Sequence, residues 1–199
     1  MIEFDVAALF VQHNGAYSVP GVDPWPEWRD ARLYNGPFPV VAHPPCERWG
    51  NFAAGGPSPY SKRSMPGEDG GCFESALASV RRWGGVLEHP AGSELWAAAG
   101  LPLPGHLPDD FGGWTLEVEQ WVWGHRAIKP TWLYIAGPKV GHYPALPTPA
   151  MSRPSGSSAR TVGGAREGGA RSMLERLPKT QRHITPPAFA AWLVELVSQ

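Results

Sequence analysis

The sequence predicts an α/β fold built on a parallel sheet, because short apolar strands alternate with helical stretches between residues 39 and 136. We expect strands at 39–42, 85–88, 116–121 and 131–136, and helices at 72–83 and 93–99. A sheet of this kind binds its ligands in the crevice outside the carboxyl ends of its strands. The residues that follow the predicted strands are therefore the first candidates for a functional site.

The strand at 39–42 is an apolar run that stops at His43-Pro44-Pro45-Cys46, because two prolines cannot continue a ladder of hydrogen bonds. This ending places Cys46 just past the carboxyl end of the strand. A loop rich in Gly, Ser and Pro follows from residue 50 to residue 71. The helix at 72–83 is predicted from apolar residues at helical spacing, which are Phe73, Ala76, Leu77 and Val80.

The later elements have similar boundary signals. The strand at 85–88 ends at His89-Pro90, and Ser93 is typical of the cap of a short helix. The strands at 116–121 and 131–136 flank Gly124-His125-Arg126. Near the end of the chain, Thr185-Pro186-Pro187 is expected to begin an amphipathic helix with an apolar face made of Phe189, Trp192, Leu193 and Leu196.

The pattern divides the chain into three parts. Residues 1–136 are expected to form one α/β catalytic core, and residues 184–199 a helix that docks on it. Residues 137–183 are rich in Gly, Pro, Ser and Arg and predict a flexible insertion. Between residues 153 and 182 this insertion has seven basic and two acidic residues, so it either follows a phosphate backbone or is a solvated loop.

The composition constrains the class of protein more than its function. The formal net charge is −1, which neither favours nor excludes nucleic acid as a partner. With 23 Pro, 24 Gly and 10 Trp, we expect loops with aromatic side chains, a combination typical of binding surfaces. Two Cys without a secretory signal, and no apolar run of about 18 residues, predict a cytoplasmic protein without a membrane span.

Cys46 is the candidate nucleophile, because a Cys after two prolines at a strand end is held on a stiff turn. Its thiolate would need a nearby positive group, which His43 or Arg48 could supply. The alternative is a buried, unreactive Cys, and we expect that role for Cys72 at the start of a helix.

Glu88 is the second candidate, because a carboxylate at the end of an apolar strand is costly unless it has a function or a partner. The alternative is a salt bridge or a helix-cap contact. A zinc site built from Cys46, His43, His89 and His125 is a weaker hypothesis, because these residues lack the close spacing of zinc ligands.

Three blocks of the chain together resemble DNA cytosine-5 methyltransferases. In that family one strand ends in Pro-Cys, a later strand ends in Glu-Asn, and a third block has Gln, an aromatic-Gly pair and basic residues before a strand. This chain is similar at Pro45-Cys46, at Glu88-His89-Pro90, and at Gln120 with Trp123-Gly124-His125-Arg126 and Lys129. His89 stands where the family has Asn.

The resemblance implies a truncated Rossmann-like sheet of the methyltransferase type with flanking helices. It implies that Cys46 attacks C6 of a pyrimidine turned out of the DNA stack, while Glu88 hydrogen-bonds N3 and the exocyclic amine. The residues implied to contact the substrate or support its site are His43, Pro45, Arg48, His89, Gln120, His125, Arg126 and Lys129.

The family also binds S-adenosylmethionine through a glycine-rich loop after its first strand. That loop has no Phe-x-Gly-x-Gly counterpart in this chain, and Asn14, Tyr17 and Asp23 are the residues left to contact the cofactor.

Two other functions remain open at this point. One is an enzyme of the same fold that acts on a free nucleotide, and the other is a non-catalytic binding protein that kept the scaffold. Short chains with such a Pro-Cys block also resemble DNA-modification proteins of bacteriophages, which implies the cytoplasm of a bacterial cell.

Overall fold

A computed structural model describes residues 3–46, 48–49, 68–148, 181 and 183–199. The described chain is an α/β structure with one mixed sheet of six strands in the order β2-β1-β3-β4-β6-β5. The strands are β1 (Val6–Leu9), β2 (Val22–Trp25), β3 (Val40–Ala42), β4 (Gly85–Pro90), β5 (Trp114–Glu119) and β6 (Pro130–Ala136).

The first four strands are parallel, and the order in which they lie creates a switch point in the sheet. From β1 the chain crosses to β2 on one side, and from β3 it crosses to β4 on the other side. The strands β1 and β3 are adjacent, with Ala8 paired to Val41. In open α/β sheets the ligand crevice lies outside the carboxyl ends of the strands at such a point.

The prediction of a parallel sheet is wrong for its last two strands. β6 runs antiparallel to both β4 and β5, with Glu88 opposite Leu133 and Leu116 opposite the same Leu133. The reason is the length of the connection, because residues 120–129 are too few for the crossover that a parallel pair requires. The strands β5 and β6 therefore form an antiparallel pair at one side of the sheet.

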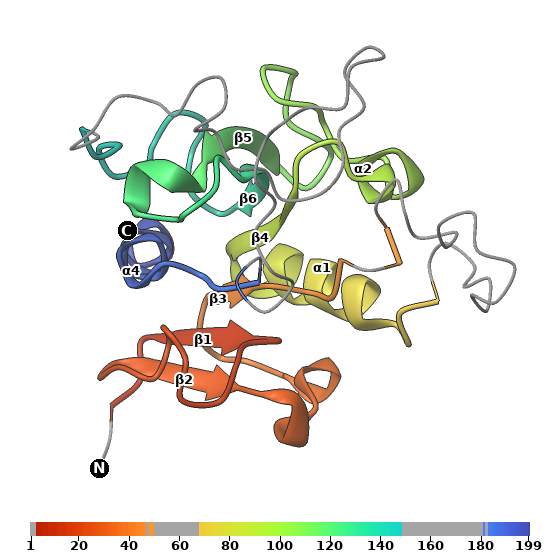
Figure 1. Cartoon of the computed structure of the whole chain (residues 1–199). Helices are drawn as coiled ribbons and strands as arrows, with labels where there is room; N and C mark the ends of the chain where they lie inside the picture. The colour runs from red at the N-terminus through yellow and green to blue at the C-terminus, as the bar shows by residue number, and fades with distance from the viewer. Residues whose placement is uncertain (1–2, 47, 50–67, 149–180, 182) are drawn as a thin grey trace, which may run out of the picture.

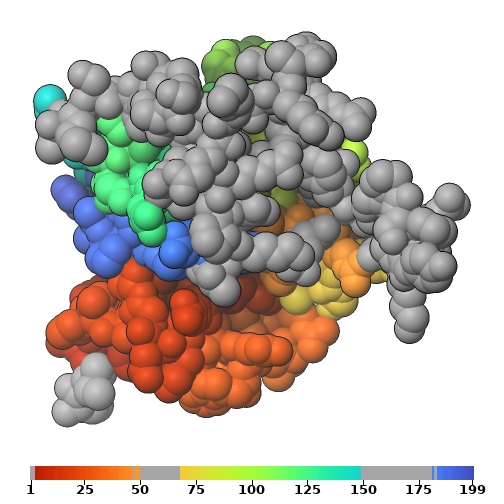
Figure 2. Space-filling view, in the orientation of Figure 1, coloured from red at the N-terminus to blue at the C-terminus, as the bar shows by residue number. Residues whose placement is uncertain are grey.

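Helices cover both faces of the sheet (Figure 1). The helices α1 (Cys72–Trp83) and α2 (Glu94–Ala98) pack on one face, where Leu87 and Tyr134 are fully buried. Helix α4 (Pro187–Val197) packs on the other face, against Val86 and Leu133. In the space-filling view, the blue surface of α4 lies between the red N-terminal strands and the green segment around β5 (Figure 2).

Most predicted elements are confirmed with shifted ends. Helix α1 has the predicted bounds, and Ser93 caps α2 by accepting from the backbone N–H of Leu95. The strand predicted at 116–121 is instead β5 at 114–119, followed by a 3-10 turn, η3 (Gln120–Trp123). The strands β1 and β2 and the 3-10 turns η1 (Glu27–Arg29) and η2 (Ala31–Leu33) were not predicted.

Gly85 lets β4 approach β3 closely. Its φ of +136° is one that other residues rarely adopt, and an added Cβ would lie 2.0 Å from the carbonyl oxygen of Val40. The close pairing of these two strands sets the distance between the segments that follow them.

Two predictions fall outside the described residues. These are most of the insertion at 137–183, including its seven basic residues, and most of the Gly-rich loop at 50–71. In the part of the chain that the structure describes, every helix is too short or too polar to cross a membrane.

Candidate active site

Five segments meet at one edge of the sheet on the face covered by α4. They are the ends of the parallel strands β1, β3 and β4, the end of β5, and the start of the antiparallel β6. The antiparallel direction of β6 is what brings its first residues to this edge. The polar residues gathered here are Tyr17, His43, Glu88, Gln120, Lys129 and Thr131.

Glu88 is the centre of this polar cluster. Its Oε2 lies 3.1 Å from His43 Nδ1, and its Oε1 accepts a hydrogen bond of 2.8 Å from Gln120 Nε2. Gln120 is fully buried and donates its second amide hydrogen to Thr131 Oγ1 at 3.0 Å. Two of the three sequence blocks of the predicted site, together with His43 before Cys46, therefore contribute to the same group of hydrogen bonds.

The Glu88 carboxyl is ionised in this setting. Burial raises its pKa, but the charge of Lys129 and the contact with His43 outweigh burial and lower the pKa to about 2. Lys129 is itself buried, directly before β6. A buried carboxylate with these neighbours accepts hydrogen bonds and cannot act as an acid near neutral pH.

Tyr17 extends the cluster across the switch point. It lies on the connection between β1 and β2, and its hydroxyl is 2.6 Å from His43 Nε2. Tyr17 is 3% exposed, so burial, with the added effect of the Glu88 charge, holds its pKa well above the usual value. Tyr17 therefore keeps its proton.

Cys46 lies four residues after the last residue of β3 and is half-buried. Its carbonyl oxygen accepts a hydrogen bond of 3.1 Å from the Trp49 N–H, which closes a turn that contains the half-buried Arg48. The carbonyl of the exposed Pro45 lies close enough to His89 to raise its pKa in part. Through this contact the Pro-Cys turn lies against the end of β4.

His89 follows Glu88 on β4, so the two side chains point to opposite faces of the sheet. His89 is 1% exposed and lies against Trp96, with ring centroids 6.3 Å apart. Burial lowers its pKa to about 4, so its imidazole is neutral at pH 7. Neither ring nitrogen has a hydrogen bond within the described residues. The structure thus separates His89 from the cluster around Glu88.

Two further residues of the third block lie at the rim of the cluster. The ring nitrogen Nδ1 of the buried His125 accepts a hydrogen bond of 3.0 Å from the Ala127 N–H, which shapes the turn before Lys129. The exposed Arg126 donates to Gln181 Oε1 over 2.7 Å. Arg126 is therefore at the surface, whereas the charge of Lys129 lowers the pKa of Glu88.

The three residues expected to contact S-adenosylmethionine do not fit that role together. The Tyr17 hydroxyl is bonded to His43, and the Asp23 carboxylate accepts from Arg29 and from Trp25 Nε1. Asn14 is exposed and has a φ of 53°. Two of the three polar groups are thus already engaged within the protein, and we derive no chemical step through this cofactor.

The zinc hypothesis gains no support from the geometry. Within the described ranges, no group of three or more His, Cys, Asp and Glu side chains is placed to hold a metal ion. Cys72 is half-buried, and burial raises the pKa of its thiol, which disfavours the reactive thiolate there.

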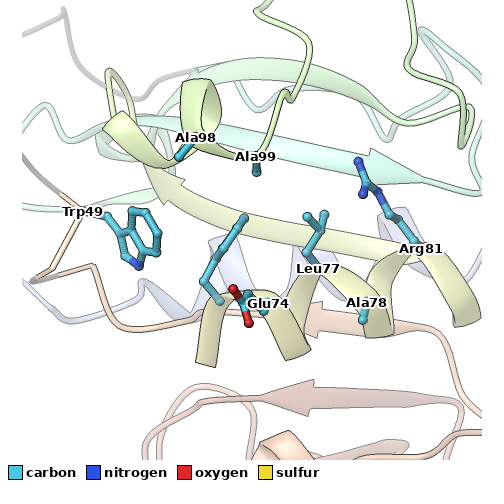
Figure 3. Close-up of a pocket in the computed structure, with 8 residues that line it drawn as sticks. Trp49, Glu74, Leu77, Ala78, Arg81, Ala98 and Ala99 are labelled. Atoms are coloured by element: carbon cyan, nitrogen blue, oxygen red, sulfur yellow. The ribbon is translucent and has the colours of Figure 1, made fainter. Parts of the chain in front are cut away.

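A hollow of about 320 Å³ lies on the opposite face of the sheet, between α1 and α2 (Figure 3). Trp49 stands at one end of it and Arg81 at the other. The Arg81 guanidinium is bound to Asp109 over 2.8 Å and also to the Tyr134 hydroxyl. Neither Cys46 nor Glu88 lines this hollow.

Two residues of the cluster had no predicted part in it. The sequence predicts Thr131 only as the start of a strand, and Tyr17 only as a residue that contacts the cofactor. Thr131 is a polar residue at the start of an otherwise apolar strand, Trp132-Leu133-Tyr134-Ile135. A polar residue in this position is a signal that identifies Thr131 as a candidate site residue. The pairing of Tyr17 with His43 depends on the order of β1 and β3, which the sequence pattern did not predict.

The chain matches no family model, no curated protein and no solved structure, so its function has to be argued from the geometry of this site.

Proposed function

We propose that this chain is a DNA base-modifying enzyme, in which Cys46 attacks C6 of a pyrimidine turned out of the stack and Glu88 binds the base. One observation carries the proposal: the Glu88 carboxylate is contacted by His43, three residues before Cys46, and by Gln120 from the third block. The second and third blocks that resemble cytosine-5 methyltransferases are far apart in sequence, and their meeting with His43 around one ionised carboxylate favours a common purpose. The switch point at β1 and β3 supports a truncated Rossmann-like sheet as part of the same proposal.

The chemistry proposed for Cys46 is an addition that can be reversed. The thiol loses its proton to water, the sulfur forms a bond to C6, and the C5=C6 electron pair forms a C4=C5 double bond while the C4=N3 pair takes up a proton from water at N3. C5 then takes an electrophile, loses its hydrogen as a proton, and the sulfur leaves as the double bond returns. Glu88 supports this sequence as an anion, because it accepts hydrogen bonds from the exocyclic amine and from the N–H that forms when N3 takes up a proton from water.

The first test uses a proton as the electrophile, so that no group donor is needed. In deuterated buffer, reversible addition of Cys46 exchanges the C5 hydrogen of the pyrimidine for deuterium. We expect exchange in a single-stranded oligonucleotide with wild type, a loss of at least 100-fold in Cys46→Ser, and little change in Cys72→Ser, which changes the other Cys of the chain. Exchange in free nucleotides alone would favour the nucleotide enzyme, and unchanged exchange in Cys46→Ser would refute the role of Cys46.

A second test reads the product in cells. Mass spectrometry of nucleosides from the DNA of cells that express wild type is expected to show a new pyrimidine nucleoside, absent with Cys46→Ser and present with Cys72→Ser. Its mass identifies the transferred group. If wild type produces neither exchange at C5 nor a new nucleoside, the non-catalytic binding protein becomes the better hypothesis.

A further inference from the structure

Tyr17, His43 and Glu88 form a continuous chain of hydrogen bonds that crosses the switch point of the sheet. The Tyr17 hydroxyl lies 2.6 Å from His43 Nε2, and His43 Nδ1 lies 3.1 Å from Glu88 Oε2. The side chains of His43 and Glu88 are 12% and 8% exposed, so solvent has little access to either contact. The three residues come from the segment after β1, the segment after β3 and from β4 itself.

The positions of the hydrogens follow from the partners. Glu88 is an anion and only accepts, and its other oxygen already accepts from Gln120. His43 Nδ1 must therefore carry the hydrogen of their shared bond. When the imidazole is neutral it has one N–H, so His43 Nε2 is then the acceptor and the Tyr17 hydroxyl is the donor to it.

We propose that Tyr17 and His43 are positioning residues for Glu88: His43 donates from Nδ1 to the carboxylate and holds it correctly oriented for the base, and the Tyr17 hydroxyl holds the His43 ring in place through Nε2. The proposal rests on the proposed function for the identity of the ligand, but the assignment of the tautomer does not depend on it.

This arrangement determines what Glu88 offers to a ligand. Each carboxylate oxygen has two lone pairs, and the bonds from His43 and Gln120 use one on each oxygen. One lone pair remains on each oxygen for N–H groups on the edge of a base.

The tautomer is tested by nitrogen NMR of the full chain with labelled histidine. The His43 signals are assigned by their absence in His43→Asn, and we expect the Nδ1–H form alone in the neutral imidazole of wild type. In Tyr17→Phe, which removes only the hydroxyl, we expect the same tautomer with a shifted Nε2 signal, because that nitrogen loses its hydrogen bond to the hydroxyl. The Nε2–H form in wild type, or an unchanged spectrum in Tyr17→Phe, would overturn the proposal whether or not the chain is an enzyme.

The effect on the site is tested by the C5 exchange reaction. His43→Asn keeps an N–H near the place of Nδ1 and should stay within about 10-fold of wild type, whereas His43→Leu should lose at least 100-fold, mostly in kcat. In His43→Leu the acidic limb of the pH profile should move to higher pH, because Glu88 loses the contact with His43 that lowers its pKa. The charged or titratable groups that remain near Glu88 are Lys129 and His89. The control is His13→Asn, since His13 is exposed and lies against Trp28.

The outcomes separate this proposal from the proposed function. If wild type catalyses exchange and His43→Leu keeps the full rate and the same acidic limb, the positioning role is refuted and the proposed function stands. No exchange by wild type would refute the proposed function, and the NMR result would then decide the tautomer by itself. If His43→Leu does not fold, Tyr17→Phe takes its place, with an expected loss of about 10-fold and an acidic limb moved in the same direction.

Discussion

Gln120 and Glu88 are 32 residues apart in the chain, and the amide nitrogen of Gln120 donates to Glu88 Oε1 over 2.8 Å. The bond joins the 3-10 turn after β5 to the middle of the sheet. Its geometry also fixes the amide of Gln120, because the opposite orientation would point the amide oxygen at a carboxylate. The oxygen Oε1 of Gln120 is left without a hydrogen bond in the described part of the protein, which is a cost that the bonds to Glu88 and Thr131 offset.

Replacing this amide by an apolar side chain of similar length should destabilise the fold. We expect Gln120→Met to lower the free energy of unfolding by about 1–3 kcal/mol, because Glu88 then loses a donor in a buried site. Urea denaturation at pH 7 measures the loss, and Gln12→Met at an exposed position is the control. Equal stability of Gln120→Met and wild type would mean that the amide contributes nothing to holding the carboxylate.

The ionised Glu88 should make the protein sensitive to strong acid. Its pKa is about 2 when folded and near 4.5 when unfolded, so the unfolded chain binds more protons between these values and stability falls as the pH drops through them. The loss amounts to about 3 kcal/mol. Urea denaturation between pH 4 and 2 should show a steep slope in wild type and in the exposed-site control Glu3→Gln, and a shallower one in Glu88→Gln. An equally steep slope in Glu88→Gln would contradict the assignment.

His89 should produce a separate loss of stability at milder pH. Its pKa is about 4 in the fold against 6.5 in the unfolded chain, so the unfolded chain binds the extra proton between pH 6.5 and 4. The neutral ring makes its full contribution to the free energy of unfolding above pH 6.5, and this contribution decreases as the pH falls from 6.5 to 4. His89→Phe should flatten the slope there, whereas the exposed His106→Gln should keep it. The opposite pattern would place the titrating group at another histidine.

The close approach of β3 and β4 should make Gly85 hard to replace. An added Cβ would meet the Val40 carbonyl oxygen at 2.0 Å, so Gly85→Ala should cost about 3 kcal/mol or more of unfolding free energy. Gly92→Ala is the matched control, because Gly92 also has a positive φ of 75° but nothing lies within 4 Å of its added Cβ. We expect about 1 kcal/mol for the control, from backbone strain alone. Similar losses for both variants would show that strain, and not the clash, decides the outcome.

The parts of the fold that were predicted are those with a strong local signal. Helix α1 has a clear apolar stripe and glycines at both ends, and β3 is stopped by Pro44 and Pro45. The strands β1 and β2 were missed because each is only four residues long, and β2 contains Pro24. Strands this short are recognisable only once their neighbours are known, because the sheet and not the local sequence stabilises them.

For the candidate site, the sequence predicted residues but not their contacts. The second and third blocks led to Glu88 and Gln120, and the ending of the strand at 39–42 led to His43. The opposite directions of Glu88 and His89 follow from the pleat of β4, but only after its true end at Pro90 is known. The antiparallel course of β6, which brings Lys129 and Thr131 to the same edge, depends on the short connection between β5 and β6.

Helix α4 covers one face of the sheet with Phe189, Leu193 and Leu196, which are fully buried. These residues follow all six strands in the chain, and the first of those strands begins at Val6. During synthesis the apolar face of β1, β3 and β4 thus stays open to water until residue 197 has been added. The polar cluster around Glu88 lies on that same face, so the chain is complete to α4 before the site becomes dry and the carboxylate acquires its final charge environment.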